Sequence, residues 1–128
     1  MLLSACGGAF LSTEVTAAFI HTPDWLHSWD YTLLKSAHNH FNQFGYLMVL
    51  FGITLPYSKI PLKYKQAQTI GMIAGCVGMG PCMIWKAAVG VSDTNHITSV
   101  VIGILVSAAL CALATHFAGL MAKYLEKS

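Results

Sequence analysis

Four long runs of hydrophobic residues, separated by shorter polar segments, make up most of the sequence. The runs cover roughly residues 1–20, 38–55, 67–90 and 95–123. Crossing the hydrocarbon core of a bilayer takes about 20 helical residues, and each run comes near that length. None of them alternates between apolar and polar positions as a half-buried strand does, and a helix satisfies its own backbone hydrogen bonds in lipid. We therefore predict an all-α, integral membrane four-helix up-down bundle that forms a single domain over residues 1–128.

The composition supports this prediction and excludes other classes of protein. Of the 128 residues, 55% are hydrophobic and only 9% are charged, which is too apolar for a soluble domain of this size. All seven basic residues are lysines, and they form no basic stripe of the kind that binds nucleic acid. We therefore expect lipid and other membrane subunits as partners, and no nucleic acid.

The lysines also predict how the chain is oriented. Three of them, Lys59, Lys63 and Lys65, lie between the second and third runs, and Lys123 and Lys127 lie in the C-terminal tail. In an up-down bundle these two segments share one side of the membrane, and the positive-inside rule makes that side cytoplasmic. We therefore expect a protein of the bacterial inner membrane with both termini in the cytoplasm.

The opposite, outer side would collect the connection 21–37 and most of the histidines. Tryptophan and tyrosine in this connection suit the depth of the headgroups, so we predict an interfacial turn followed by a short amphipathic helix. Helices one and three would end on the side where helices two and four begin. Five of the six histidines would therefore fall at the outer face: His21, His27, His38, His40 and His96.

The spacing of two of these histidines predicts a cofactor between helices. His38 and His96 each open a predicted helix, and a glycine follows seven residues later in both, at Gly45 and Gly103. Seven residues are about two helical turns, so each glycine shares a face with its histidine and would let a planar macrocycle approach the backbone. His38 and His40 lie about 200° apart on a helix, so we expect His38 as the ligand and His40 as a supporting or surface group.

Other polar residues complete the candidate site. If the cofactor is a haem, Asn39, Asn42 or Gln43 would donate hydrogen bonds to its propionates. Glu14 lies inside the first run, where an acid is costly, and would accept a proton, orient a histidine or contact a partner. His116 lies about 30 Å farther along the fourth run than His96, so it would instead hydrogen-bond across helices or contact a neighbouring subunit.

Small residues shape the third run. Gly71, Gly75 and Gly78 would let this helix pack closely against a neighbour. Pro81 should kink it, because proline has no N–H to donate to the preceding turn.

One stretch resembles a known family. The 24 residues "LLKSAHNHFNQFGYLMVLFGITLP" are similar to the opening of the second helix in the haem-copper oxidase subunit I family. In that family the histidine of this helix is an axial ligand of low-spin haem, and the resemblance implies this role for His38. The chain has no arginine before the run, no paired downstream histidines and no histidine trio for copper. Oxygen reduction by this chain alone is therefore not expected.

Three classes of function remain. In the first, the chain binds haem b through His96 and His38, with His40 as the alternative to His38. It passes electrons between quinol or a periplasmic carrier and a partner, within a larger respiratory or redox complex. In the second, the histidines and amides are interface residues wetted by headgroups, and the chain is a non-catalytic accessory subunit. In the third, His38, His40 and His96 hold copper or zinc together with a methionine or Glu14. We expect the first, with no catalysis by the chain alone.

Overall fold

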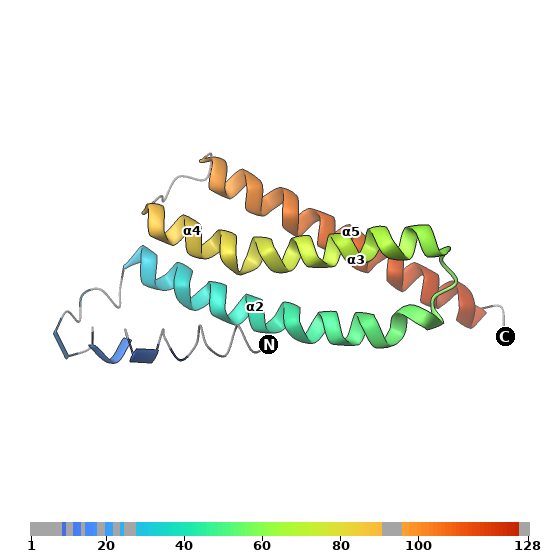
Figure 1. Ribbon diagram of the computed structural model, residues 1–128, viewed down its shortest axis with the longest axis horizontal. Coiled ribbons are helices and arrows are strands. Elements are labelled where there is room, and N and C mark those ends of the chain that lie inside the picture. Colours follow the sequence, from blue (N-terminus) through green and yellow to red (C-terminus); the bar gives the residue numbers. More distant parts are fainter. Residues whose placement is uncertain are drawn as a thin grey trace.

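The computed structural model describes residues 28–90 and 96–125, together with residues 9, 12, 13, 15–17, 20, 21 and 24. Within these residues the chain is helical and contains no strand, so the predicted all-α class is confirmed. Residues 28–90 and 96–125 form four α-helices: α2 Trp29–Thr54, α3 Leu62–Met79, α4 Pro81–Val89 and α5 Ile97–Leu125, with a 3-10 turn, η2, at Leu55–Tyr57. α2 and α5 run in one direction, and α3 and α4 run in the other and pack against both (Figure 1).

The second helix begins earlier than the sequence predicted. We expected a helix from 38, whereas α2 starts at Trp29, so the short interfacial helix expected in the connection is the first part of α2. Ser28 has extended backbone angles and its hydroxyl accepts a hydrogen bond from the Tyr31 N–H at 3.2 Å, which is the geometry of an N-cap. Asp30 adds a negative charge to the first turn, where it stabilises the helix dipole.

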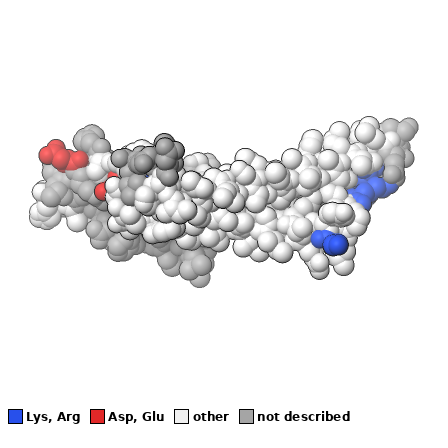
Figure 2. Space-filling model, turned by 90° about the horizontal axis from the view of Figure 1, so that it is seen from above, with Lys and Arg blue, Asp and Glu red and all other residues white. Residues whose placement is uncertain are grey.

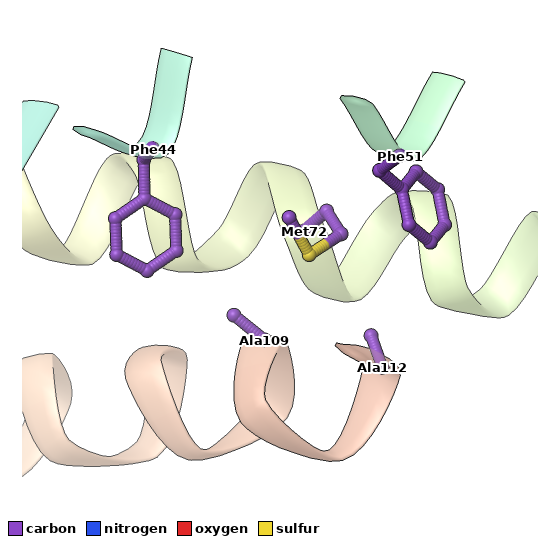
Figure 3. Close-up of a cluster of buried hydrophobic side chains, with 5 residues drawn as sticks. All are labelled: Phe44, Phe51, Met72, Ala109 and Ala112. Atoms are coloured by element: carbon purple, nitrogen blue, oxygen red, sulfur yellow. The ribbon is translucent and has the colours of Figure 1, made fainter. Parts of the chain in front are cut away.

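α2 and α5 each bury one narrow stripe of side chains. On α5 the stripe recurs at alternating intervals of four and three residues, which keeps it on one face of the helix. Its members are Thr98, Ile102, Leu105, Ala109, Ala112, His116 and Gly119. On α2, Phe44 and Phe51 lie seven residues apart and reach toward Met72 of α3, with alanines of α5 beyond (Figure 3). The core consists of this cluster and a second one formed by α2 and α4, and Met79 packs against both.

The third helix packs closely on α5 through its glycines, as predicted. A Cβ atom added at Gly71 would lie 3.0 Å from the Ala108 carbonyl oxygen. One added at Gly75 would overlap the Ala109 side chain, and one at Gly78 would lie 2.9 Å from Leu105 Cβ. Contacts this short leave no room for any side chain, so hydrogen atoms on these positions allow the two backbones to approach.

The break between α3 and α4 lies at Gly80 and Pro81, as the proline in the sequence led us to predict. Pro81 has no N–H, so the carbonyl oxygen four residues earlier loses its helical partner. The backbone leaves the helical region at Gly80, with φ −106° and ψ −92°, and Pro81 occupies the first position of α4. A Cβ atom at Gly80 would lie 3.0 Å from Phe41 Cγ, so the phenyl ring of α2 rests directly against the break. α4 then ends at Gly90, whose φ of 68° is left-handed.

Two helical segments of the described chain are long and apolar enough to cross a membrane. They are the 28 residues of Leu62–Val89, which include α3 and α4, and the 29 residues of α5. In the most apolar stretch of α5 only 17% of residues are buried, so its large side chains lie mainly on the outside of the described chain. The predicted first span, 1–20, lies largely outside the described residues.

The glycines of α3 give a direct test of the α3–α5 contact. We expect Gly75→Ala to destabilise the protein by about 1–3 kcal/mol, because its methyl group would overlap Ala109 and force the helices apart. Gly103→Ala is the matched control: nothing lies within 4 Å of its Cβ position, and alanine has the higher helix propensity. Thermal unfolding in detergent micelles measures both. Equal stability of the two variants would contradict this packing.

Candidate functional site

His38 and His40 lie well inside α2 and each contacts an amide one turn further on. His38 Nε2 is 3.2 Å from Asn42 Nδ2, and His40 Nδ1 is 3.2 Å from Gln43 Oε1. Relative to the buried Ala37, His38 is rotated about 100° to one side and His40 about 60° to the other. Both imidazoles are half-buried. They therefore occupy the two flanks of α2 and not the stripe that faces the core.

The amide atoms assign different roles to the two imidazoles. The Asn42 amide nitrogen is a donor, so His38 Nε2 accepts and its lone pair is used within the helix. The Gln43 amide oxygen is an acceptor, so His40 donates from Nδ1 and keeps a lone pair on Nε2. Histidine ligands of metals donate their second nitrogen in this way. The local geometry thus favours His40 over His38 as a ligand, the reverse of the preference drawn from the sequence.

His96 caps the start of α5. Its Nδ1 accepts a hydrogen bond from the Thr98 N–H at 3.4 Å and lies 3.0 Å from Thr98 Oγ1. Its carbonyl oxygen accepts from the N–H of Ser99 at 2.9 Å. The first N–H groups of a helix lack partners within the helix, so a side-chain acceptor at this position satisfies one of them.

The structure does not bring His38 and His96 together. α4 lies between the two helices that carry them (Figure 1). An apolar cluster of Leu33, Ala37, Met83 and Ala87 joins α2 to α4 there, with Ile102 of α5 packed against it. Met83 of α4 is thus part of an apolar contact.

The glycines paired with these histidines were also expected to face a cofactor. Gly103 lies about 140° from Thr98 around α5, away from the buried stripe, and nothing lies within 4 Å of its Cβ position. Gly45 is half-buried on the same flank of α2 as His38. Among the described residues, no group of three histidine, cysteine, aspartate or glutamate side chains could hold a metal ion. Glu14 lies outside the described residues, and the haem and metal hypotheses stay predictions.

The lysine of α4 is buried near the same end of the bundle. Lys86 is 9% exposed and its Nζ donates to Ser99 Oγ at 2.6 Å. The ammonium group also lies 5.9 Å from the centroid of the Trp29 ring, within the range of a cation–π contact. Lys86 therefore ties α4 to the first turns of α2 and α5.

The opposite end of the bundle holds a cluster of polar side chains, here called the inner polar cluster. Its members are the buried Ser58, Gln68 and His116, the half-buried Thr54 and the exposed Thr115. His116 is only 5% exposed, and its ring centroid lies 4.6 Å from that of Phe51. Its Nε2 is 2.9 Å from Thr54 Oγ1, so it hydrogen-bonds across helices, one of the two roles expected for it. Gln68 Nε2 donates to Thr115 Oγ1 at 2.9 Å.

Sequence reasoning singled out His116 alone from the inner polar cluster. For Gln68, the spacing of the small residues of α3 contained a signal. Gln68 lies three and seven residues before Gly71 and Gly75, and so faces α5 with them. His116 lies four residues after Ala112 on the buried stripe of α5. A polar side chain in phase with a buried stripe predicts an internal hydrogen bond.

Comparison of the chain with family models, with curated proteins and with solved structures finds no significant match. The site is therefore interpreted from its own geometry.

The bond between Thr54 and His116 can be tested by an isosteric substitution. The Thr54 hydroxyl donates to the carbonyl oxygen of Leu50 at 2.8 Å, so its oxygen accepts from His116. Thr54→Val leaves a buried imidazole N–H without an acceptor and should destabilise the protein by about 1–3 kcal/mol. In the control Thr69→Val, the lost bond runs only to the Lys65 carbonyl of the same helix, so a much smaller effect is expected. Chemical unfolding in micelles measures the difference, and equal losses would contradict the interhelical bond.

Proposed function

We propose that the chain is an integral membrane helical-bundle protein that acts as a non-catalytic accessory subunit of a larger membrane complex. The observation that carries this proposal is the exposed apolar surface of the two longest apolar segments. Leu110, near the middle of α5, is 58% exposed, and Ile70 on α3 is 68% exposed. A water-soluble protein rarely leaves such contiguous apolar patches uncovered, whereas lipid chains or apolar helices of a partner would cover them.

The distribution of charge supports a membrane orientation. On the face shown in Figure 2, lysines gather at one end of the molecule and acidic residues at the other, with an uncharged stretch between them. The lysine end contains the turn after α2 and the end of α5, where Lys123 lies 5.2 Å from the centroid of the Tyr57 ring. By the positive-inside rule this end would face the cytoplasm.

The polar flanks of α2 support assembly with other subunits. Asn39 and Gln43 are exposed, and His38, His40 and Asn42 are half-buried, although they lie in the middle turns of a helix that packs beside two apolar ones. Amide and imidazole groups are costly against lipid chains even when they are paired with one another within the helix, as His38 is with Asn42 and His40 with Gln43. A neighbouring subunit or a hydrated interface would give this stretch of α2 a polar environment.

A lysine introduced into the exposed face of α5 distinguishes a membrane protein from a soluble one. We expect Leu110→Lys to reduce stable membrane integration, because lysine at the centre of a spanning helix costs about 2.5–3.5 kcal/mol. Tyr124→Lys is the control: this side chain is 69% exposed but lies beside Lys123 at the end of the helix. The measurement is the fraction of full-length protein that resists alkaline carbonate extraction. Complete extraction of the unaltered chain would contradict the proposal.

A redox cofactor is the second candidate, and one observation favours it. His40 donates from Nδ1 to an amide oxygen, which orients its Nε2 as a ligand for haem iron, copper or zinc. A bound haem b would supply reversible one-electron transfer, so the chain would then pass electrons between quinol or another carrier and its complex. The second ligand would come from a partner subunit or from outside the described residues.

Two alanine variants test the cofactor candidate. We expect His40→Ala to abolish the reduced-minus-oxidised haem spectrum of the purified complex, or its copper or zinc content, because the ligand is lost. His38→Ala should retain both, since the lone pair of His38 is held by Asn42. Loss in the His38 variant alone would reverse the assignment. A complex without haem, copper or zinc would remove this candidate and leave the accessory role standing.

A further inference from the structure

The inner polar cluster contains three buried polar atoms that have no hydrogen-bond partner among the described residues. They are Ser58 Oγ, Gln68 Oε1 and His116 Nδ1, each with less than 1 Å² of exposed surface. The three side chains are only 4–5% exposed as a whole. A buried polar atom left without a partner costs about 1–3 kcal/mol, so three of them at one end of a bundle require an explanation.

The three side chains meet α5 within little more than one turn. Gln68 hydrogen-bonds Thr115, and His116 is the next residue along the helix. Ser58 reaches α5 one turn later, where any side chain in place of Gly119 would overlap its hydroxyl. The backbone is fixed there as well, because the Lys59 N–H donates to the Gly119 carbonyl oxygen at 3.3 Å. The three side chains therefore belong to, or lie against, the same short segment of α5, from Thr115 to Gly119.

We propose that the inner polar cluster is a binding site for a single water molecule. The water donates hydrogen bonds to His116 Nδ1 and to Gln68 Oε1, and it accepts one from Ser58 Oγ. Buried waters make about three hydrogen bonds to groups that would otherwise be unpaired, and this site offers three.

The neighbouring threonines fix which atom of Gln68 is unpaired. The hydroxyl of Thr115 donates to the carbonyl oxygen of Cys111 at 2.9 Å, with that of Ala112 also within 3.0 Å. Its single hydrogen is thus used within α5, and its oxygen can only accept. The amide nitrogen of Gln68 must be the group that faces it, so the amide oxygen is the unpaired acceptor.

The same reasoning fixes the tautomer of His116. Thr54 uses its hydroxyl hydrogen on the carbonyl oxygens of Leu50 and Phe51, at 2.8 and 3.2 Å, and so accepts from His116 Nε2–H. The neutral imidazole then carries its proton on Nε2 and a lone pair on Nδ1. The site therefore presents two acceptors, together with a hydroxyl that can donate.

The two acceptors and the one hydroxyl determine which kind of ligand fits the site. An anion would face two lone pairs, which disfavours it. A metal cation would face the positive charge of Lys65, one turn before Gln68 on α3, with no carboxylate among the residues that form the site. The nearly complete burial of all three atoms also excludes a large ligand. Water is small and neutral, donates two hydrogen bonds and accepts others, and so fits each requirement.

The direction in which Ser58→Ala changes the melting temperature tests the site. If a water accepts from Ser58, then Ser58→Ala removes one of its three bonds, and the melting temperature of the full-length chain in micelles should fall by roughly 2–6 °C. If the site were dry, alanine would remove a buried unpaired hydroxyl, and the melting temperature would rise. Ser107→Ala, at an exposed serine in α5, is the control and should leave the melting temperature within error.

Nuclear magnetic resonance of the same chain, labelled with ¹⁵N-histidine, provides an independent readout. The His116 signals are identified by their loss in His116→Gln. We expect a protonated Nε2, an unprotonated Nδ1 that accepts a hydrogen bond, and magnetisation transfer from a bound water to this ring. A rise or no change in melting temperature for Ser58→Ala would overturn the proposal. A proton on Nδ1, or absence of transfer from water, would do the same.

Discussion

The close approach of α3 to α5 is the contact on which the other features of the molecule depend. It requires glycine at three positions along one face of α3, because side chains there would collide with α5. Helices in lipid gain no hydrophobic free energy by associating, so tight packing and interhelical hydrogen bonds hold them together. Both occur along this seam, since the same approach brings Gln68 within bonding distance of Thr115. α2 completes the core by covering the pair with Phe44 and Phe51.

Much of the fold could be predicted from the sequence, because long apolar runs, glycines at helical spacing and a proline each have a direct structural cause. The close packing of α3 and its break before Pro81 follow from such residues. The start of α2 could not be placed from hydrophobicity, since its first turns are polar and aromatic. Ser28 and Asp30, a cap and an acid in the first turn, carried that information.

The candidate site was harder to predict, because the number of histidines near one end says nothing about their phase on a helix. His38 and His40 are close in sequence, yet they flank the buried stripe of α2 on opposite sides. His96 is used to cap α5. His116 shares the phase of Ala112 and is therefore buried and hydrogen-bonded to another helix. In this helical bundle, the environment of a polar residue is predicted by whether it shares a helical face with the buried small and apolar residues. The identity of the residues next to it in the sequence predicts that environment less well.

The contact of Phe41 with Gly80 joins α2 to the break between α3 and α4. The phenyl ring lies against the break between α3 and α4, where a Cβ atom on Gly80 would collide with it. In the sequence, Phe41 lies between His40 and Asn42. The break between α3 and α4 is therefore in direct contact with the turn of α2 that carries His38 and His40. A side chain larger than hydrogen at position 80 would have to displace that turn or the Phe41 ring.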